Sequence, residues 1–490
     1  MPKRTSPSQP STVAEPEVPL PAQVPIKAKP TGRLDGYAQA KAYLDSRLNV
    51  EAMRPAQVDS AATFNLDRMR ALMAKLGNPQ NSFLSVHVAG SKGKGSVCEM
   101  LGSVLATCRC TVGLYTSPHL VTLRERIRLQ GHNLSEADFA RLLTTVVAAS
   151  ADIPKKLGEA TYFELLTAMM YVHFAEQAVD VGIIEVGLGG EHDATNVITP
   201  AVSIITALQK EHTQLLGTSL AEIARAKSGI IKPGVACYTL SQPPEAMAVL
   251  EERAAAVGAP LKVLGKNVEF SYRFEALSPN RGLHAKVCLT GTRGMFEHLV
   301  VPLHGEHQAL NCGLALGAID ALRERGFSCP DGMVAEGLRR TPLNGRLERV
   351  SDSPPIYVDG AHNPESVQAV VKSVASHLRP DSMVVVFGCA SDKDIARMLP
   401  GIAAGADKVI FTRADSSERS TDPRDLARKF SEISSRMYQI GPNLREALGL
   451  ARRAVGRGDI ILVTGSFLMA GQAKRILLAE RSGSAENKPR

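Results

Sequence analysis

Short apolar runs alternate with amphipathic stretches along most of the chain. The pattern predicts strands at Phe83–Ala89, Thr111–Tyr115, Val181–Val186 and Val202–Leu208, and helices at Ser96–Ala106 and Tyr162–Glu176. Strands that are continuously apolar, rather than alternating with polar positions, are typical of a parallel sheet covered on both faces. The alternation of strands with helices therefore predicts an α/β fold with a parallel-rich sheet.

A second, shorter series of strands and helices follows Pro342. The strands are expected at Ile356–Val358, Met383–Phe387, Lys408–Phe411 and Ile460–Val463. We therefore expect a larger domain over residues 37–343 and a smaller Rossmann-like α/β domain over 344–480, with a hinge near residues 342–345.

Both ends of the chain have a composition that cannot bury a core. The first thirty residues contain eight prolines, and no aromatic residue occurs before Tyr37. Such a segment predicts a disordered tail over residues 1–36. Residues 481–490 are expected to be frayed.

Composition excludes several classes of protein. A chain of 490 residues with 44% hydrophobic and 22% charged residues is ordinary for a soluble protein of more than one domain. No apolar stretch reaches the roughly 20 residues that cross a bilayer, so we expect no membrane partner. The net charge of +8 favours anionic ligands. Because the basic residues are scattered and aromatics are only 4%, a nucleic-acid groove is not expected.

The cysteines and the composition of the N-terminus indicate in which compartment of the cell the protein is expected. The eight cysteines form no CxxC pair, and the N-terminus carries no apolar signal segment. We therefore expect reduced thiols in a cytoplasmic protein.

The strongest local motif is Gly90-Ser91-Lys92-Gly93-Lys94-Gly95-Ser96, which follows a predicted strand and opens a predicted helix. Glycines let a backbone wrap closely around phosphate, and a helix N-terminus favours an anion. Lys94 would reach the terminal phosphates. The alternative is a glycine-rich surface turn, and the motif alone indicates only a nucleotide.

Further motifs follow in order: Thr116-Ser117-Pro118-His119-Leu120, Glu185 before Gly187-Leu188-Gly189-Gly190, Asp193-Ala194-Thr195-Asn196-Val197, Gly229-Ile230-Ile231-Lys232-Pro233-Gly234 and Asp359-Gly360-Ala361-His362-Asn363-Pro364. Together with the glycine-rich loop they resemble, over roughly residues 37–475, the folylpolyglutamate synthase/dihydrofolate synthase family of the Mur ligase superfamily. The resemblance implies a phosphate-loop domain for ATP, Mg²⁺ and a pterin, and a Rossmann-like ligase domain.

The resemblance implies an ATP-dependent amide ligase that releases ADP. ATP would phosphorylate a substrate carboxylate to an acyl phosphate, and the amine of L-glutamate would attack it. The acceptor would be dihydropteroate, the γ-carboxylate of a tetrahydrofolate, or both. We expect a monomer that acts on these small molecules.

The resemblance also implies roles for single residues. ATP would be bound by Gly90, Gly93, Lys94, Gly95, Ser96, Asn311, Arg346 and Asp359. Mg²⁺ would be bound by Ser117, Glu185, His212 and Lys227, with Lys227 carbamylated so that it offers oxygen ligands. Lys94, Lys227, Asp359 and His362 would act in catalysis, and Ser466 would lie by the incoming glutamate.

A pterin pocket is implied by two further segments. Thr161, Tyr162, Phe163 and Glu164 form the first, and His192, Asp193 and Ala194 form the second. Aromatic rings offer apolar faces to a flat pterin, and a carboxylate accepts from its N–H groups.

Several positions depart from the family pattern. Lys92 stands where asparagine is common, Glu191-His192 replaces Arg-Leu, and Glu211 replaces aspartate. The reversed charge at Glu191 leaves the acceptor open. Taken singly, Glu185 could be a salt-bridged carboxylate, His212 a loop histidine and Lys227 a solvated lysine.

Three other functions stay open at this point. One is a cell-wall Mur ligase that joins amino acids to a nucleotide-linked sugar. A second is a phosphate-loop NTPase that acts as a switch without glutamate. A third is a degenerate, non-catalytic nucleotide-binding paralogue.

Overall fold

The computed structural model describes residues 34–51, 53, 58, 63–278, 281–301, 303–415 and 419–486. The tail expected over residues 1–36 lies outside the described residues up to position 33, and helix α1 (Gly36–Asp45) begins at its last position. Among the described residues, the structure contains no helix with the length and apolarity needed to cross a membrane.

The larger unit is built on an eight-stranded sheet in the order β4-β3-β2-β5-β1-β6-β7-β8. The strands are β1 (Leu84–Ala89), β2 (Val112–Tyr115), β3 (Ile127–Leu129), β4 (His132–Asn133), β5 (Val181–Glu185), β6 (Val202–Ile205), β7 (Cys237–Thr239) and β8 (Leu261–Val263). Strand β1 is parallel to both β5 and β6, with Val88 opposite Glu185 and Ala89 opposite Ile205. The carboxyl ends of the three central strands therefore lie at one edge, where a parallel sheet places its ligand site.

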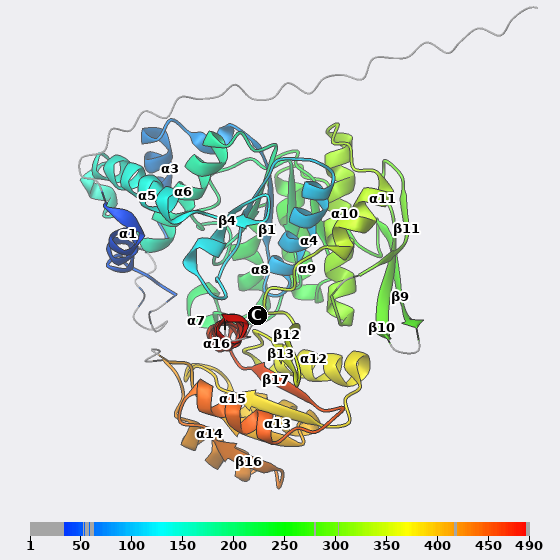
Figure 1. The fold of residues 1–490 in the computed structure, drawn as a ribbon. Helices are drawn as coiled ribbons and strands as arrows, with labels where there is room; N and C mark the ends of the chain where they lie inside the picture. Colours follow the sequence, from blue (N-terminus) through cyan, green and yellow to red (C-terminus); the bar gives the residue numbers. More distant parts are fainter. Residues whose placement is uncertain are drawn as a thin grey trace, which may run out of the picture.

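Helices cover both faces of this sheet (Figure 1). They are α3 (Leu66–Lys75), α4 (Lys94–Thr107), α5 (Glu136–Ala151), α6 (Tyr162–Glu176), α7 (Thr213–Leu216), α8 (Leu220–Ser228), α9 (Pro244–Ala256), α10 (Glu306–Glu324) and α11 (Asp331–Arg339), with 3₁₀ turns at Pro79–Asn81, Leu123–Arg126 and Lys155–Leu157. One buried apolar cluster joins the sheet to α4, α10 and α11, and another joins it to α1, α3, α5 and α6. This two-faced burial is why the central strands are mostly apolar, and the polar Ser85, His87 and Ser203 on them are buried as well.

A three-stranded antiparallel sheet is an element that the sequence pattern did not predict. It contains β9 (Glu269–Ser278), β10 (Arg281–Thr290) and β11 (Met295–Val300), in the order β11-β10-β9. One face of β10 buries Ala285, Val287 and Leu289 in the same apolar cluster as α10.

The smaller unit has a six-stranded sheet in the order β12-β13-β17-β14-β15-β16. Its strands are β12 (Glu348–Asp352), β13 (Pro355–Val358), β14 (Met383–Phe387), β15 (Lys408–Phe411), β16 (Met437–Ile440) and β17 (Ile460–Thr464). All are parallel except β12. The helices are α12 (Pro364–Ser373), a π-helical turn at Val374–Leu378, α13 (Ile395–Gly405), α14 (Pro423–Ser431), α15 (Leu444–Arg453) and α16 (Phe467–Glu486). The α/β fold class with two parallel-rich sheets is confirmed.

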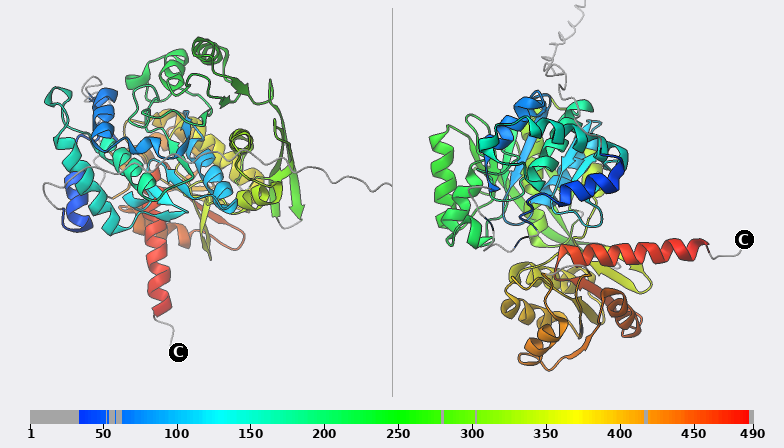
Figure 2. Two further views of the ribbon diagram at one scale, coloured as in Figure 1. Left: turned by 90° about the horizontal axis from the view of Figure 1, so that it is seen from above. Right: turned by 90° about the vertical axis from the view of Figure 1, so that its left-hand side faces the viewer.

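The two units lie one above the other, and α16 runs between them before it projects outward (Figure 2). The predicted hinge at residues 342–345 falls in the connection between α11 and β12. The expectation of a frayed end from position 481 is corrected for its first part, because α16 continues through Glu486. Each further helical residue adds one backbone hydrogen bond to a turn already formed, so a long helix propagates easily.

Candidate active site

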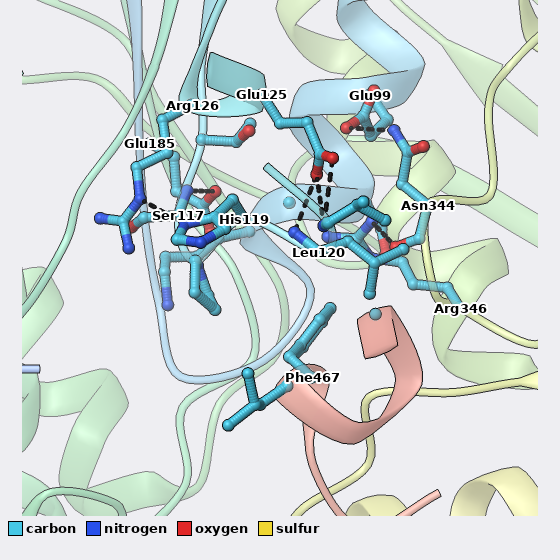
Figure 3. Close-up of a pocket in the computed structure, with 18 of the residues that line it drawn as sticks. Glu99, Ser117, His119, Leu120, Glu125, Arg126, Glu185, Asn344, Arg346 and Phe467 are labelled. Carbon is cyan, nitrogen blue, oxygen red and sulfur yellow. Dashed lines mark hydrogen bonds between the residues drawn. The ribbon is translucent and has the colours of Figure 1, made fainter. Parts of the chain in front are cut away.

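A cavity of about 1600 Å³ lies at the carboxyl edge of the central strands, between the two units. Figure 3 shows part of it, with Phe467 at the start of α16 on one side and Glu185 and Ser117 on the other. Its wall includes several predicted site residues: Gly93, Lys94, Gly95, Ser96, Ser117, Glu185 and His212 from the larger unit, and Arg346, His362 and Ser466 from the smaller one.

The glycine-rich loop joins β1 to α4, as predicted, and its glycines leave no room for side chains. Gly93 has a φ of +95°, and a Cβ built there would lie 2.2 Å from Asn311 Oδ1. A Cβ on Gly95 would lie 2.1 Å from Arg346 Nη2. Lys94 Nζ donates to the carbonyl oxygen of Gly90 at 3.0 Å. Two of the three residues predicted for ATP outside the loop, Asn311 and Arg346, thus lie directly against it.

Glu185 is the last residue of β5, and its carboxylate is buried. Its Oε2 accepts from the backbone N–H of Ser117 at 3.0 Å. Burial raises the pKa of Glu185, and Lys94 and the Ser117 N–H act in the opposite direction. The carboxylate lies beside the phosphate loop, where oxygen ligands for Mg²⁺ are needed.

Lys227, at the end of α8, is buried. Its Nζ donates to the Gly90 carbonyl at 2.9 Å and to Glu211 Oε1 at 3.1 Å. Burial lowers the pKa of Lys227 to about 8, although the Glu211 carboxylate raises it. A free amine is the form that reacts with CO₂, so this environment favours carbamylation more than a solvated lysine does.

His212 precedes α7 in a left-handed conformation, with φ 48°. Burial lowers the pKa of His212 to about 4, which keeps its imidazole in the neutral form that binds metals. Among the described residues, no three His, Cys, Asp or Glu side chains gather in a way that could hold a metal ion. A complete site would therefore need the Ser117 oxygen and a modified Lys227 beside Glu185 and His212. Carboxylate, carbamate and hydroxyl oxygens fit the ligand preference of Mg²⁺.

Asp359 is turned toward the backbone and is absent from the cavity wall. Its Oδ2 accepts from the N–H of Leu347 and its Oδ1 from the N–H of Ala361, both at 2.8 Å. Burial raises the pKa of Asp359 to about 6, while the two N–H groups and Arg346 lower it. The structure thus places Asp359 behind the turn that carries Arg346.

His362 and Ser466 both lie on the cavity wall, in different settings. His362 Nδ1 lies 2.8 Å from the carbonyl oxygen of Gly360, and burial lowers the pKa of His362 to about 3. Ser466 Oγ accepts from the N–H of Met469 at 3.1 Å, as a helix cap does. His362 therefore presents a neutral ring to the cavity. The Ser466 hydroxyl also lies on the cavity wall, but it accepts a hydrogen bond that caps the start of α16.

The first predicted pterin segment starts α6. Thr161 and Glu164 form a capping box, and Glu164 makes a buried ion pair with Arg68 at 2.8 Å. The Phe163 ring closes over Gly187, where a Cβ would lie 2.4 Å from Phe163 Cζ. Of these residues, only Tyr162 lies on the wall of the large cavity.

The second predicted pterin segment lies away from the large cavity. Asp193 Oδ2 accepts from the N–H of Leu188 at 2.9 Å, and its Oδ1 accepts from the N–H of Thr195 at 3.0 Å. Ala194 belongs to an apolar cluster. His192 lines a separate cavity of about 410 Å³. The structure therefore does not bring the two pterin segments together on one wall.

Sequence reasoning missed a charged cluster on the cavity wall (Figure 3). Arg126 is 2% exposed, donates to both carboxylate oxygens of Glu51 and donates from Nε to His119 Nδ1 at 3.1 Å. The Arg126 guanidinium carbon lies 5.8 Å from the centre of the Tyr162 ring. The alternating charges of Arg124, Glu125 and Arg126, just before the strand at Ile127, could have indicated this cluster. A search for apolar positions does not detect them.

Both units match known protein families. Residues 88–319 match the family described as "Mur ligase middle domain", and residues 345–467 match "Mur ligase, glutamate ligase domain".

Curated relatives cover most of the chain. A dihydrofolate synthase/folylpolyglutamate synthase of Bacillus subtilis is 31% identical over 90% of this chain and 99% of its own length. The protein of the same name from Mycobacterium tuberculosis is 33% identical over 84% of this chain and 90% of its own length.

Solved structures of similar proteins have the same fold over most of this chain. Mycobacterium tuberculosis folylpolyglutamate synthase, complexed with ADP and AMPPCP, gives a TM-score of 0.80 at 31% identity and covers 90% of this chain and 98% of that one. Escherichia coli FolC, in complex with DHPP and ADP, gives a TM-score of 0.76 at 26% identity and covers 92% of this chain and all of that one.

Proposed function

Since the chain belongs to the folylpolyglutamate synthase/dihydrofolate synthase family, we propose that it is an ATP-dependent ligase that joins L-glutamate to dihydropteroate, to folates, or to both. One observation carries the proposal. The phosphate loop, the Glu185 carboxylate and the His362 imidazole line a single cavity between two units. A ligase needs that arrangement, because it must hold a nucleotide, a carboxylate and an amine together.

The first step is phosphoryl transfer from ATP to the acceptor carboxylate. The backbone N–H groups of the loop, the N-terminus of α4 and Lys94 bind the phosphates. Arg346, which lies against Gly95, adds a guanidinium on the side of the smaller unit. The acceptor carboxylate oxygen attacks the γ-phosphorus, ADP leaves, and an acyl phosphate forms.

The second step is attack by the free amine of L-glutamate on the acyl carbon, and inorganic phosphate leaves. His362 marks the wall of the smaller unit against which that glutamate would lie. Ser466 lies on the same wall, near the start of α16.

We assign Ser117, Glu185 and His212 as the residues that would hold Mg²⁺, with Lys227 joining them as a carbamate. A bound Mg²⁺ would neutralise charge on the phosphates. Lys227 lies beside Gly90 and Glu211, and its lowered pKa supports the modification.

We further propose that the protein works as a monomer in the cytoplasm. All eight cysteines are free thiols, and seven of them are buried, which fits a reducing compartment.

Phosphate release tests the function. With Mg·ATP and L-glutamate, the purified protein should release phosphate when dihydropteroate or tetrahydrofolate is added, and the product mass should rise by one glutamate. Lys94→Ala should lower turnover at least about 100-fold. The exposed Lys266, which pairs with Glu251, provides a control in Lys266→Ala. Silence with both acceptors from folded protein that binds ATP would contradict the ligase and favour a non-catalytic paralogue.

A further inference from the structure

The phosphate loop carries a second lysine that points away from the first. Lys94 Nζ turns back to the Gly90 carbonyl, whereas Lys92 Nζ lies 3.4 Å from His362 Nε2, across the junction between the units. The Lys92 backbone is fixed, since its N–H donates to the Ala207 carbonyl at 3.1 Å. The long side chain therefore starts from a rigid base and ends on the smaller unit.

The His362 ring is oriented to receive this ammonium. Its Nδ1 faces the carbonyl oxygen of Gly360 at 2.8 Å, and a carbonyl can only accept. Nδ1 therefore carries the hydrogen and Nε2 presents its lone pair. Lysine can only donate, so the ammonium of Lys92 is the donor. The contact fixes the ring in one orientation at the cavity wall.

Glu211 holds Lys92 in this position. Glu211 Oε2 lies 3.9 Å from Lys92 Nζ, and its Oε1 accepts from Lys227. The side chains of Lys92 and Glu211 are largely buried, with exposures of 25% and 14%. The charges that act on Lys92 are the cations Lys94 and Lys393 and the carboxylates Glu211 and Glu365. A polar row thus runs from Glu211 through Lys92 to His362.

The row contains two of the positions where this chain departs from its family. By the resemblance to the family, Lys92 stands where asparagine is common and Glu211 stands where aspartate is. An asparagine side chain is about two bonds shorter than a lysine side chain and carries no charge. The two departures lie next to each other, and the added cation faces the lengthened carboxylate.

We propose that Lys92 is a positioning residue of the ligase reaction: it holds the His362 imidazole against the phosphate loop, and Glu211 keeps its ammonium there. The proposal rests on the proposed function, since His362 lies on the wall of the cavity assigned to the glutamate. Lys92 links the nucleotide side of the cavity to the glutamate side.

Steady-state kinetics of Lys92→Met and Lys92→Arg test this role. In Lys92→Met the KM for L-glutamate should rise about tenfold while the KM for ATP stays within about twofold. Lys92→Arg, which keeps a donor, should recover part of the loss. The control is Lys210→Met, an exposed lysine beside Glu211, which should match the wild type. An unchanged KM for L-glutamate, or an equal rise in both KM values, overturns the proposal.

A double-mutant cycle tests the coupling of the two departures. Lys92→Asn and Glu211→Asp should each raise the KM for L-glutamate. In the double variant this KM should rise by less than the product of the two single fold-increases. Multiplicative effects would contradict the coupling.

Two further readouts separate this proposal from the ligase assignment. The wild type is assayed first: no glutamate-dependent turnover there rejects the ligase itself, whereas an active wild type with normal Lys92→Met kinetics rejects only the role of Lys92. Independently, the ring signals of His362 in NMR should titrate at a higher pH in Lys92→Met, because a neighbouring cation has been removed. Unchanged titration would show that the contact is not made.

Discussion

The guanidinium of Arg346 lies where a side chain on Gly95 would have to be. A Cβ on Gly95 would be 2.1 Å from Arg346 Nη2 and 3.7 Å from Glu185 Oε2. Gly95 is in the first turn of α4, and Arg346 lies in the connection to the smaller unit. The missing side chain lets an arginine from one unit reach the helix N-terminus of the other, where the phosphates of a nucleotide would bind.

Gly95→Ala should therefore separate activity from stability. The new methyl group would push the flexible end of Arg346 aside, and we expect ATP-dependent turnover to fall at least about tenfold. The helix itself should gain roughly 0.5–1 kcal/mol, since alanine favours a helix over glycine. Turnover and thermal unfolding measure the two effects.

The control is Gly332→Ala in α11, where a Cβ would meet nothing within 4 Å. That variant should keep full turnover. If Gly95→Ala kept it as well, the contact between Arg346 and the phosphate loop would have no role in turnover.

Asp359→Asn should destabilise the smaller unit. The carboxylate accepts from two backbone N–H groups, of Leu347 and Ala361, and an amide has only one oxygen to offer them. One N–H would face an NH₂ group, at a cost of about 1–3 kcal/mol. Urea unfolding should show this loss. Turnover should fall too, because the turn that carries Arg346 loosens. A stable variant that lost only ATP binding would instead make Asp359 a nucleotide ligand.

Two neighbours on α6 should respond in opposite ways. Tyr162 lies on the cavity wall but is only 4% exposed, so Tyr162→Phe, which keeps the buried ring and removes the hydroxyl, should raise the KM for dihydropteroate several-fold with little loss of stability. Glu164→Gln should leave Arg68 buried without its counter-charge and cost about 3–5 kcal/mol. Acceptor kinetics and thermal unfolding of both variants check this. A reversal of the two phenotypes would place the acceptor at Glu164.

If Lys227 is carbamylated, the activity of the enzyme should depend on CO₂ and on pH. Its pKa is lowered to about 8, chiefly by burial, so the reactive free amine becomes abundant as the pH rises toward 8. Protein dialysed free of CO₂ should lose activity, and bicarbonate should restore it. At a fixed concentration of dissolved CO₂, restoration should be faster at pH 8 than at pH 6 and should level off above pH 8. Full activity after CO₂ removal would exclude the carbamate.

The sequence pattern predicted the buried elements closely. The bounds of α6, β14 and β15 agree with the structure, because these segments are strongly apolar and have clear ends. The antiparallel sheet β9–β11 contains no long continuously apolar run, because apolar positions such as Ala285, Val287 and Leu289 alternate with polar ones, and the prediction of strands from continuous apolar runs therefore missed it. Thus Glu275 on β9 pairs with Lys286 on β10.

The site was only partly predictable, for a different reason. Motifs mark which residues matter, but not what each side chain contacts. Asp359 and Asp193 both satisfy backbone N–H groups, and such bonds leave no trace in a pattern of side chains. The Lys92–His362 contact joins residues 270 positions apart and depends on how the two units meet.

The most direct test of the account follows one oxygen atom. Dihydropteroate or tetrahydrofolate labelled with ¹⁸O in the reacting carboxylate is turned over with Mg·ATP and L-glutamate, and the released phosphate and the product are analysed by mass spectrometry. An acyl phosphate transfers one carboxylate oxygen to phosphorus, so each phosphate released should carry one ¹⁸O and each product one added glutamate. Phosphate without label would contradict acyl-phosphate ligation at this cavity.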